Sequence, residues 1–526
     1  MASLAGCALE LPAEAPEAGI QLCFVEGDCA QGEVCEEGFC VVETSIRERV
    51  AIQLTPSNTS DVLTEQFPVV ELTQGRPLPD LQFQRPKLVR GVVLALGADA
   101  DSPPQPINAE LIFRRTEPVI AGLTPHYQIS ARREGGYHAL LPNGLYEITI
   151  LPESADIPPE QVRQLPITAD TQYDATLSGR QNTIEVTGRL VLTDVRNNKV
   201  SPVGGARVSA IDAGDARAST LATTAEDGTF TLLVRQNVEA VRLSFTPPSG
   251  SFLMPRVVTE SIVLTGASVT LGDLSLGIFH LTGRPIQGIL LDERDRQPVE
   301  DVTLIFRGPV GNGTIVRTSQ SGEMGAFAID LPPGVYTVQM IPRDDTDYAI
   351  TEVTGLRVPS SGPPGGAFEG LTVKSKALVR GVAWSPDGAR PMPGAAVLMR
   401  STRLSDADDF EGSRVFSTRA DAKGRFELKV DPGTYDITLS PTDLNGHARA
   451  FTRDIEIGDG VSAIDLFADR ANLARGRVIS PDGAPMADIL IEIYRQDPQR
   501  GSVLIGSGLT NAVGEYRLLV PALRLQ

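Results

Sequence analysis

The cysteines of this sequence are spaced closely enough to form disulfides or to bind a metal ion. Cys23, Cys29, Cys35 and Cys40 lie within eighteen residues, and no cysteine follows them in the chain of 526 residues. Intervals of five, five and four residues lack the Cys-x-x-Cys pairs that are typical of structural zinc sites. An even set of clustered cysteines favours two disulfides in an oxidising compartment, and three pairings are possible.

A fifth cysteine, Cys7, ends the stretch Leu4-Ala5-Gly6-Cys7, which resembles the lipobox of bacterial lipoproteins. The resemblance implies cleavage before Cys7 and attachment of lipid to it, and Ala8 implies sorting to the outer membrane. Only six residues precede Cys7, fewer than the basic region and roughly 7–15 apolar residues of a signal peptide. We therefore expect the true start to lie upstream. The four following cysteines resemble short modules of the EGF or Dickkopf type near the N-terminus of bacterial surface proteins.

Two acidic clusters are candidates for calcium, because Ca²⁺ prefers oxygen ligands. Their members are Asp344, Asp345 and Asp347 in the first cluster, and Asp406, Asp408 and Asp409 in the second. Neither cluster matches the EF-hand loop, and a solvated loop is the alternative interpretation. We expect no other cofactor and no further metal site.

Motifs for catalysis do not occur. The histidines, His126, His138, His280 and His447, form no closely spaced pair, and no nucleophile elbow or Gly-rich phosphate loop is present. The net charge of −19 argues against nucleic acid, which needs clustered Lys and Arg. No apolar run approaches the ~20 residues of a membrane span, so we expect contact with a membrane only through a lipid anchor. The sequence predicts a protein that is not an enzyme.

The elements that position the candidate residues are predicted to be short β-strands. In Asp421–Pro441, Phe426, Leu428 and Val430 alternate with polar residues, and after Pro432-Gly433 the apolar residues again recur at every second position. Alternation with period two indicates a half-buried strand, and Pro-Gly indicates a turn. This stretch predicts a β-hairpin with an aromatic residue at the start of each strand.

The same pattern recurs with a period of about 95 residues. One marker is a strand with a central glycine, and another is an aromatic residue that follows a later glycine; a Pro that opens a strand and a Pro-Gly-x-Tyr turn complete the set. The glycines are Gly91, Gly188, Gly288, Gly381 and Gly476, and the aromatic residues are Tyr137, Phe230, Phe327, Phe426 and Tyr516. A unit of this length with roughly seven short strands is typical of an immunoglobulin-like sandwich. The predicted fold class is all-β, with tandem sandwiches in a semi-rigid rod.

These markers resemble the carboxypeptidase regulatory-like family, also called transthyretin-like or prealbumin-like. Repeat 4 carries the resemblance best, with Pro393-Gly394-Ala395-Ala396-Val397, Asp421–Phe426 and Pro432–Tyr435. The resemblance covers residues 87 to about 520 and implies a non-catalytic accessory module.

The markers divide the chain into eight segments: 1–20 (lipobox remnant and polar tether), 21–44 (disulfide-rich module), 45–86 (partial β unit, the second half of a repeat), 87–180 (repeat 1), 181–278 (repeat 2), 279–376 (repeat 3), 377–470 (repeat 4) and 471–526 (partial repeat 5, the first half). The two partial units together have the length of one repeat. They could pair within one molecule, which requires four sandwiches to bend into a ring, or head-to-tail between molecules. The alternative that we favour from sequence is truncation, with the C-terminal half only part-folded.

The predicted function is a non-enzymatic extracytoplasmic surface protein for adhesion, scaffolding or envelope architecture, as an outer-membrane lipoprotein or a secreted protein. The alternative is a carbohydrate- or peptide-binding accessory subunit of a larger envelope complex. The expected partner is a protein or a glycan at the cell surface.

Overall fold

The structure, a computed structural model, is built almost entirely of β-strands. It describes residues 33–36, 39–42, 47–57, 61–96, 102–132, 134–154, 156–178, 182–195, 197–248, 251, 254–279, 283–361, 368, 370–407, 410, 412–442, 446–497 and 501–523. In these residues the one helix is the three-residue 3-10 turn η3 (Glu323–Gly325). None of the described residues forms a helix of the length and apolarity that a membrane crossing requires.

Repeats 1 to 4 each form two stacked sheets, as the sequence predicts. The strands of repeat 1 are β6 (Lys87–Ala95), β7 (Gln105–Pro106), β8 (Ala109–Glu117), β9 (His126–Ala131), β10 (Gly136–Leu141), β11 (Gly144–Pro152), β12 (Glu160–Ile167), β13 (Thr171–Gln172) and β14 (Ala175–Leu177). Those of repeat 2 are β15 (Thr183–Asp194), β16 (Lys199–Pro202), β17 (Arg207–Ile211), β18 (Ala222–Thr223), β19 (Thr229–Arg235), β20 (Ala240–Thr246), β21 (Val257–Val258), β22 (Ile262–Val263) and β23 (Ser268–Phe279).

Repeat 3 comprises β24 (Arg284–Asp292), β25 (Thr303–Val310), β26 (Gly313–Gln320), β27 (Ala326–Leu331), β28 (Gly334–Ile341), β29 (Thr351–Val358) and β30 (Leu371–Val373). Repeat 4 comprises β31 (Ala377–Trp384), β32 (Ala396–Leu404), β33 (Val415–Arg419), β34 (Arg425–Val430), β35 (Gly433–Ser440), β36 (Ala450–Ile457), β37 (Val461–Ala463) and β38 (Leu466–Phe467). In repeat 4 one sheet has the order β33-β32-β35-β36, and the other joins β34, β31 and β37, with β38 also paired to β31.

The glycine and aromatic markers are cross-strand neighbours. Gly381 on β31 is the register partner of Phe426 on β34, and the same pairing recurs in the other repeats. The remaining pairs are Gly91 with Tyr137, Gly188 with Phe230, Gly288 with Phe327, and Gly476 with Tyr516. A Cβ built on Gly381 would lie 1.7 Å from the carbonyl oxygen of Ile464 and 2.9 Å from the Phe426 ring. Glycine is therefore required because a parallel strand and an aromatic ring cover its Cα.

The predicted hairpin across Pro432-Gly433 is wrong. β34 pairs with β31, whereas β35 pairs with β32 and β36 in the facing sheet. The Pro-Gly turn therefore carries the chain from one sheet to the other. The Tyr435 hydroxyl fixes this corner by donating to the carbonyl oxygen of Asp431, four residues upstream, at 2.6 Å. Tyr146 and Tyr336 donate in the same way to Pro142 and Pro332 at 2.8 Å.

The two partial units combine into one sandwich, here named the composite domain (47–86 with 471–521). The N-terminal segment contributes β3 (Arg47–Thr55), β4 (Glu65–Thr73) and β5 (Leu81–Gln82), and the C-terminal segment contributes β39 (Ala471–Ile479), β40 (Leu490–Asp497), β41 (Gly501–Leu509) and β42 (Glu515–Pro521). β3 pairs antiparallel with β40, and β5 pairs parallel with β39. Apolar residues of both segments, among them Ile52 and Ile493, share one buried core.

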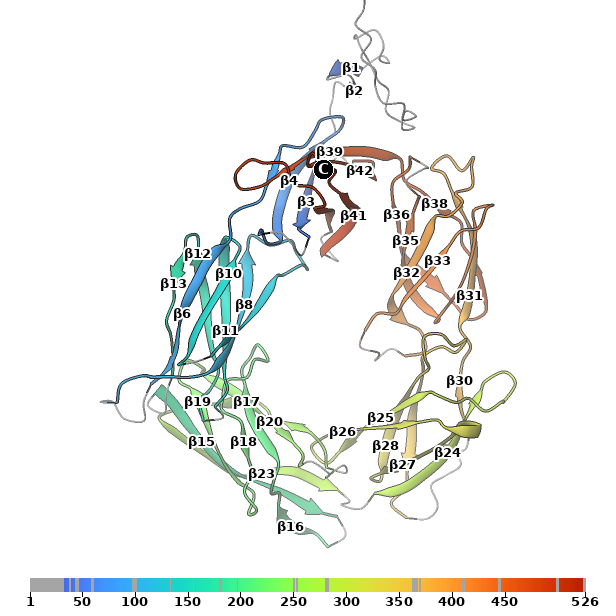
Figure 1. The fold of residues 1–526 in the computed structure, drawn as a ribbon. Coiled ribbons are helices and arrows are strands. Elements are labelled where there is room, and N and C mark those ends of the chain that lie inside the picture. Colours follow the sequence, from blue (N-terminus) through green and yellow to red (C-terminus); the bar gives the residue numbers. More distant parts are fainter. Residues whose placement is uncertain are drawn as a thin grey trace, which may run out of the picture.

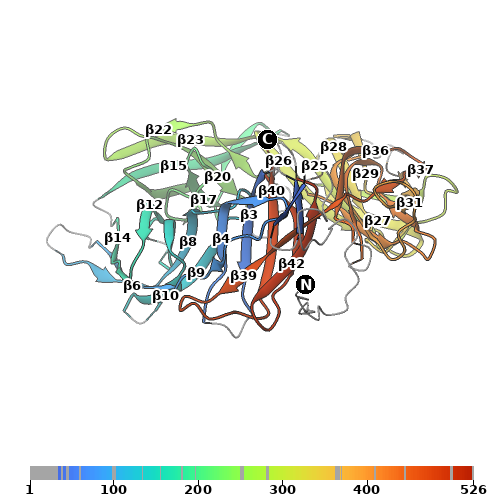
Figure 2. The ribbon, with the colours of Figure 1, turned by 90° about the horizontal axis from the view of Figure 1, so that it is seen from above.

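This pairing corrects the expectation of a part-folded C-terminal half. Figure 1 shows the composite domain closing the series of four repeats into a ring, and within this domain β3 of the N-terminal segment pairs with β40 of the C-terminal segment. Figure 2, turned by 90°, shows β3 and β40 as neighbours in one sheet. The sandwiches are in tandem as predicted, but their path bends back on itself.

The hydrophobic cores of the five sandwiches are not all separate from one another. Repeats 1 and 4 and the composite domain each have a core of their own, while the buried residues of repeats 2 and 3 form one continuous cluster. A backbone bridge joins the two repeats, because Arg256 and Thr314 exchange hydrogen bonds of 3.1 and 3.2 Å. Repeats 2 and 3 are therefore joined both by a shared core and by backbone hydrogen bonds.

Candidate functional site

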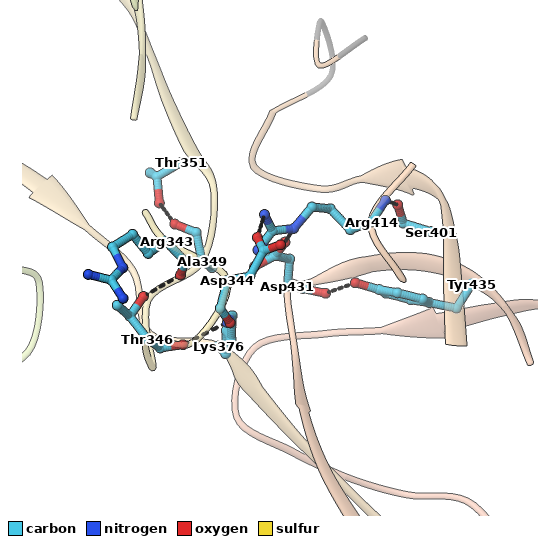
Figure 3. Close-up of polar contacts among 10 residues, drawn as sticks. All are labelled: Arg343, Asp344, Thr346, Ala349, Thr351, Lys376, Ser401, Arg414, Asp431 and Tyr435. Atoms are coloured by element: carbon cyan, nitrogen blue, oxygen red, sulfur yellow. Dashed lines mark hydrogen bonds and ion pairs between the residues drawn. The ribbon is translucent and has the colours of Figure 1, made fainter. Parts of the chain in front are cut away.

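The polar junction between repeats 3 and 4 is the place where the structure gathers one of the predicted acidic clusters. Figure 3 shows the loop between β28 and β29 of repeat 3 facing the turn between β34 and β35 of repeat 4. The linker Lys374–Lys376 runs between them. A small apolar cluster of three buried residues, Ile350, Leu404 and Ala407, packs beside the polar groups.

Asp431 is the most deeply placed charged group of this junction, with none of its surface exposed. The Arg414 Nε lies 3.1 Å from a carboxylate oxygen of Asp431, and the two side chains form an ion pair. Burial raises the pKa of the Asp431 carboxyl, and the charges of Arg414 and then Lys376 oppose this shift. A buried carboxylate beside two cations is held by charge balance across the junction.

Arg414 connects the two repeats. Its guanidinium pairs with Asp344 of repeat 3 as well as with Asp431 of its own repeat. The backbone N–H of Arg414 donates to the Ser401 hydroxyl at 2.8 Å, and its guanidinium carbon lies 5.4 Å from the centre of the Phe416 ring. The backbone of Arg414 is thus held by a hydrogen bond, and its guanidinium is held by the Phe416 ring and by two carboxylates.

Lys376 is a second buried cation in the linker. Its Nζ donates to the carbonyl oxygens of Asp344 at 2.8 Å and Thr346 at 2.6 Å, as Figure 3 shows for Thr346. Burial lowers the pKa of Lys376, and the charge of Arg414 adds to this shift while Asp431 counters it. Lys376 therefore ties the linker to the repeat 3 loop through backbone oxygens.

The described members of the two acidic clusters are held by basic side chains. Asp344 pairs with Arg414, Asp347 with Lys429 at 2.7 Å, Asp345 with Arg343 at 2.7 Å, and Asp406 with Lys374 at 2.7 Å. Asp408 and Asp409 lie outside the described residues. In the described part of the chain, no three side chains of His, Cys, Asp or Glu come together as a group that could hold a metal ion. The geometry fits ion pairs between repeats better than a calcium site.

The cysteine predictions fall largely outside the described residues, which exclude Cys7, Cys23 and Cys29. The backbone of β1 (Glu33–Glu36) pairs antiparallel with that of β2 (Phe39–Val42), with Cys35 in register with Cys40. The disulfides and the lipid on Cys7 remain predictions.

Sequence reasoning missed Asp431, Arg414, Lys374 and Lys376. One signal was available. Asp431 stands four residues before Tyr435, where the other two tyrosine corners have Pro142 and Pro332. A charged residue at a buried corner position indicates a nearby partner of opposite charge.

The junction between repeat 1 and the composite domain also contains a buried ion pair. Arg115 of repeat 1 lies 3.2 Å from Glu65 of the composite domain, and both side chains are buried. Burial raises the pKa of Glu65, opposed by the Arg115 charge. Gln66 adds two hydrogen bonds to the same repeat, by donating to the Leu123 carbonyl oxygen at 2.9 Å and accepting from the Ile120 N–H at 3.2 Å. At both junctions, buried polar groups therefore join the two neighbouring domains.

Comparisons with known proteins identify no family. No family model and no curated protein matches the chain. Among solved structures, a Streptococcal ancillary pilin is 14% identical and covers 55% of this chain and 99% of its own, with a TM-score of 0.21. The Bacillus anthracis TIE protein is 12% identical and covers 73% of this chain and 74% of its own, at 0.17. The minor pilin GBS52 of Streptococcus agalactiae is 11% identical and covers 36% and 95%, at 0.21. At these scores the matches carry no argument about what this chain does.

Proposed function

We propose that the chain is a non-enzymatic extracytoplasmic surface protein whose ring of β-sandwiches serves adhesion, scaffolding or envelope architecture. The observation that carries the proposal is the composite domain, in which strands from the two ends of the described chain complete one sandwich. Closure of this kind pairs the β3 edge of one half-domain with the β40 edge of the other, so these two edges are no longer open to strands of another chain. The buried charges at the two junctions hold neighbouring domains together.

The finer parts of the proposal rest on the sequence. Lipid on Cys7 would anchor the frame at the outer membrane, and two disulfides among Cys23, Cys29, Cys35 and Cys40 would fasten the module beside the anchor. Membership of the transthyretin-like family is likewise proposed from the repeat markers alone. The partner is a protein or a glycan at the cell surface.

The test of location uses the gene with its native upstream sequence. We expect wild-type protein in the membrane fraction and accessible to protease on intact cells, and Cys7→Ser protein in the soluble or secreted fraction. Cys7→Ser protein that stays with the membrane would overturn the lipid anchor. Wild-type protein that is protected in intact cells and digested only after lysis would overturn the surface location.

The cysteine module has its own measurement. Without reductant, the peptide that contains the four cysteines should be four protons lighter than its reduced form. Free thiols in protein isolated from the envelope would contradict the proposed disulfides.

A further inference from the structure

A cavity of about 550 Å³ lies at the junction between repeat 4 and the composite domain. Repeat 4 contributes the loop between β31 and β32 and the segment before β36; the composite domain contributes the start of β39 and the residues after β42. Its volume falls in the range of pockets that hold small ligands, roughly 300–1,000 Å³. None of its lining residues takes part in the two junctions described above.

Two arginines of this cavity have no partner. Arg390 and Arg470 line it, and within the described chain neither guanidinium makes a hydrogen bond or an ion pair. Elsewhere at the same junction, Arg453 pairs with Asp497 and Arg449 donates to the Ser507 hydroxyl at 3.1 Å. The cavity therefore keeps two fixed positive charges available in a protein with a net charge of −19.

The other polar groups add donors. Asn472 lines the cavity, and its Nδ2 is buried without a hydrogen-bond partner in the described structure. His447 also lines it. Asp387, the one acidic residue among those that line the cavity, accepts hydrogen bonds from the Ser385 hydroxyl and the Ala389 N–H. These hydrogen bonds lower the pKa of its carboxyl, and the nearby charge of Arg390 adds to this shift. A buried amide donor without a partner is costly, and it indicates an acceptor that the protein itself does not supply.

Apolar residues complete the wall, with Pro386 from repeat 4 and Leu523 from the composite domain. A ligand that fits must therefore combine an anionic end for the guanidinium groups with a body that tolerates apolar contact. Guanidinium recognises carboxylate and phosphate alike through paired hydrogen bonds.

We propose that this cavity binds a sugar-sized ligand carrying an anionic group, either a sugar acid or a sugar phosphate. Arg390 and Arg470 hold the anionic group from the two sides of the junction, Asn472 donates to it or to a neighbouring hydroxyl, and the apolar wall contacts the ring. The proposal goes beyond the proposed surface function, since it needs the cavity and neither the lipid nor the disulfides. Because the ligand touches both domains, its binding also strengthens their junction.

Calorimetry on the full chain, with glucuronate, glucose 6-phosphate and neutral glucose as probes, tests the proposal. We expect at least one of the two anionic sugars to bind, and glucose to bind at least tenfold more weakly. Binding of glucuronate alone identifies the sugar acid as the ligand class, and binding of glucose 6-phosphate alone identifies the sugar phosphate. Failure of both at millimolar concentration, or equal binding of glucose, would overturn the proposal.

Variants of the two cavity arginines test whether the ligand binds in this cavity. Arg390→Gln and Arg470→Gln should each weaken binding by about tenfold, as expected for loss of a charged hydrogen bond. Arg357→Gln, at an exposed arginine on β29 of repeat 3, is the matched control and should bind as wild type does. Circular dichroism checks that each variant is folded. Wild-type affinity in the folded double variant Arg390→Gln/Arg470→Gln would place the ligand elsewhere and refute the assignment.

Discussion

At the scale of single residues, the repeat markers are explained by close approach of backbone and ring. The central glycine of each repeat is the register partner of an aromatic residue on the neighbouring strand. In repeats 1, 3 and 4 the carbonyl oxygen of a later segment also lies within about 2 Å of the place where a Cβ would be. Any side chain at these positions must push a strand away. The marker is thus a packing requirement of the sandwich.

Gly381→Ala tests this requirement. The added methyl group would meet the Ile464 carbonyl oxygen at 1.7 Å, so we expect repeat 4 to lose roughly 1–3 kcal/mol of unfolding free energy, or more. Trp384 is the only tryptophan and lies on the same strand, so its fluorescence during urea unfolding reports on repeat 4. Gly458→Ala, where nothing lies within 4 Å, is the control. Equal stability of the two variants would contradict the packing explanation.

Buried charge at the repeat 3–repeat 4 junction predicts a pH dependence. Burial raises the folded-state pKa of Asp431 above its unfolded value near 3.8. The protonated carboxyl therefore favours the folded state; this stabilisation is full below the unfolded pKa and is lost as the pH rises through the folded pKa. Asp431→Asn cannot ionise, so the unfolding free energy of wild type relative to this variant should fall as the pH rises above about 4.

Urea unfolding followed at Trp384 over this pH range gives the measurement, and the Asp345→Asn variant gives a control at a carboxylate that is exposed. A wild-type advantage that grows with pH would show that the attraction of Arg414 and Lys376 outweighs the cost of burial, and would reverse the inference.

At the scale of elements, the sequence predicts strands well and their partners less well. The alternation through Phe426 and Tyr435 locates β34 and β35, yet a Pro-Gly turn is compatible both with a hairpin and with a crossing between sheets. The decision lies with residues distant in sequence, since β31 and β32 pair with the two strands separately. The acidic clusters show the same limit, because Asp344, Asp347 and Asp406 each pair with a basic residue that is distant in sequence. The division of the chain into eight segments itself stays a prediction.

Core continuity gives a prediction about cooperativity. Phe426 lies in a core confined to repeat 4, while Phe327 lies in the core that repeats 2 and 3 share. Each Phe→Ala change should cost roughly 3–5 kcal/mol. Phe426→Ala should accelerate hydrogen exchange in repeat 4 alone, and Phe327→Ala should do so in repeats 2 and 3 together. Exchange that increases in repeat 3 alone after Phe327→Ala would show that the shared core does not couple them.

At the scale of the whole molecule, the length of the repeat predicts how many sandwiches there are but not the angle between them. The angle at each junction depends on contacts such as Arg115 with Glu65, whose members lie in different units, and small angles add up around the series. Two half-repeats at the ends of the series could therefore be recognised as complementary from sequence, while their meeting in one molecule could not. Head-to-tail pairing between molecules uses the same strand contacts, so an experiment must separate the two.

A cross-link between β3 and β40 makes that separation. Gln53 and Glu492 are register partners, and the Gln53 amide donates to the Glu492 carboxylate at 3.0 Å. Cysteines at register partners of adjacent strands are near enough for a disulfide. In a background where Cys7 and the four N-terminal cysteines are replaced by serine, Gln53→Cys/Glu492→Cys should oxidise to a monomer that migrates differently on a non-reducing gel. The yield should not change with protein concentration, because the two cysteines meet within one chain. The single variants, which lack a partner cysteine in the same chain, should remain unshifted. A ladder of disulfide-linked oligomers that grows with concentration would instead show that the half-domains are completed between molecules and that the ring opens into a filament.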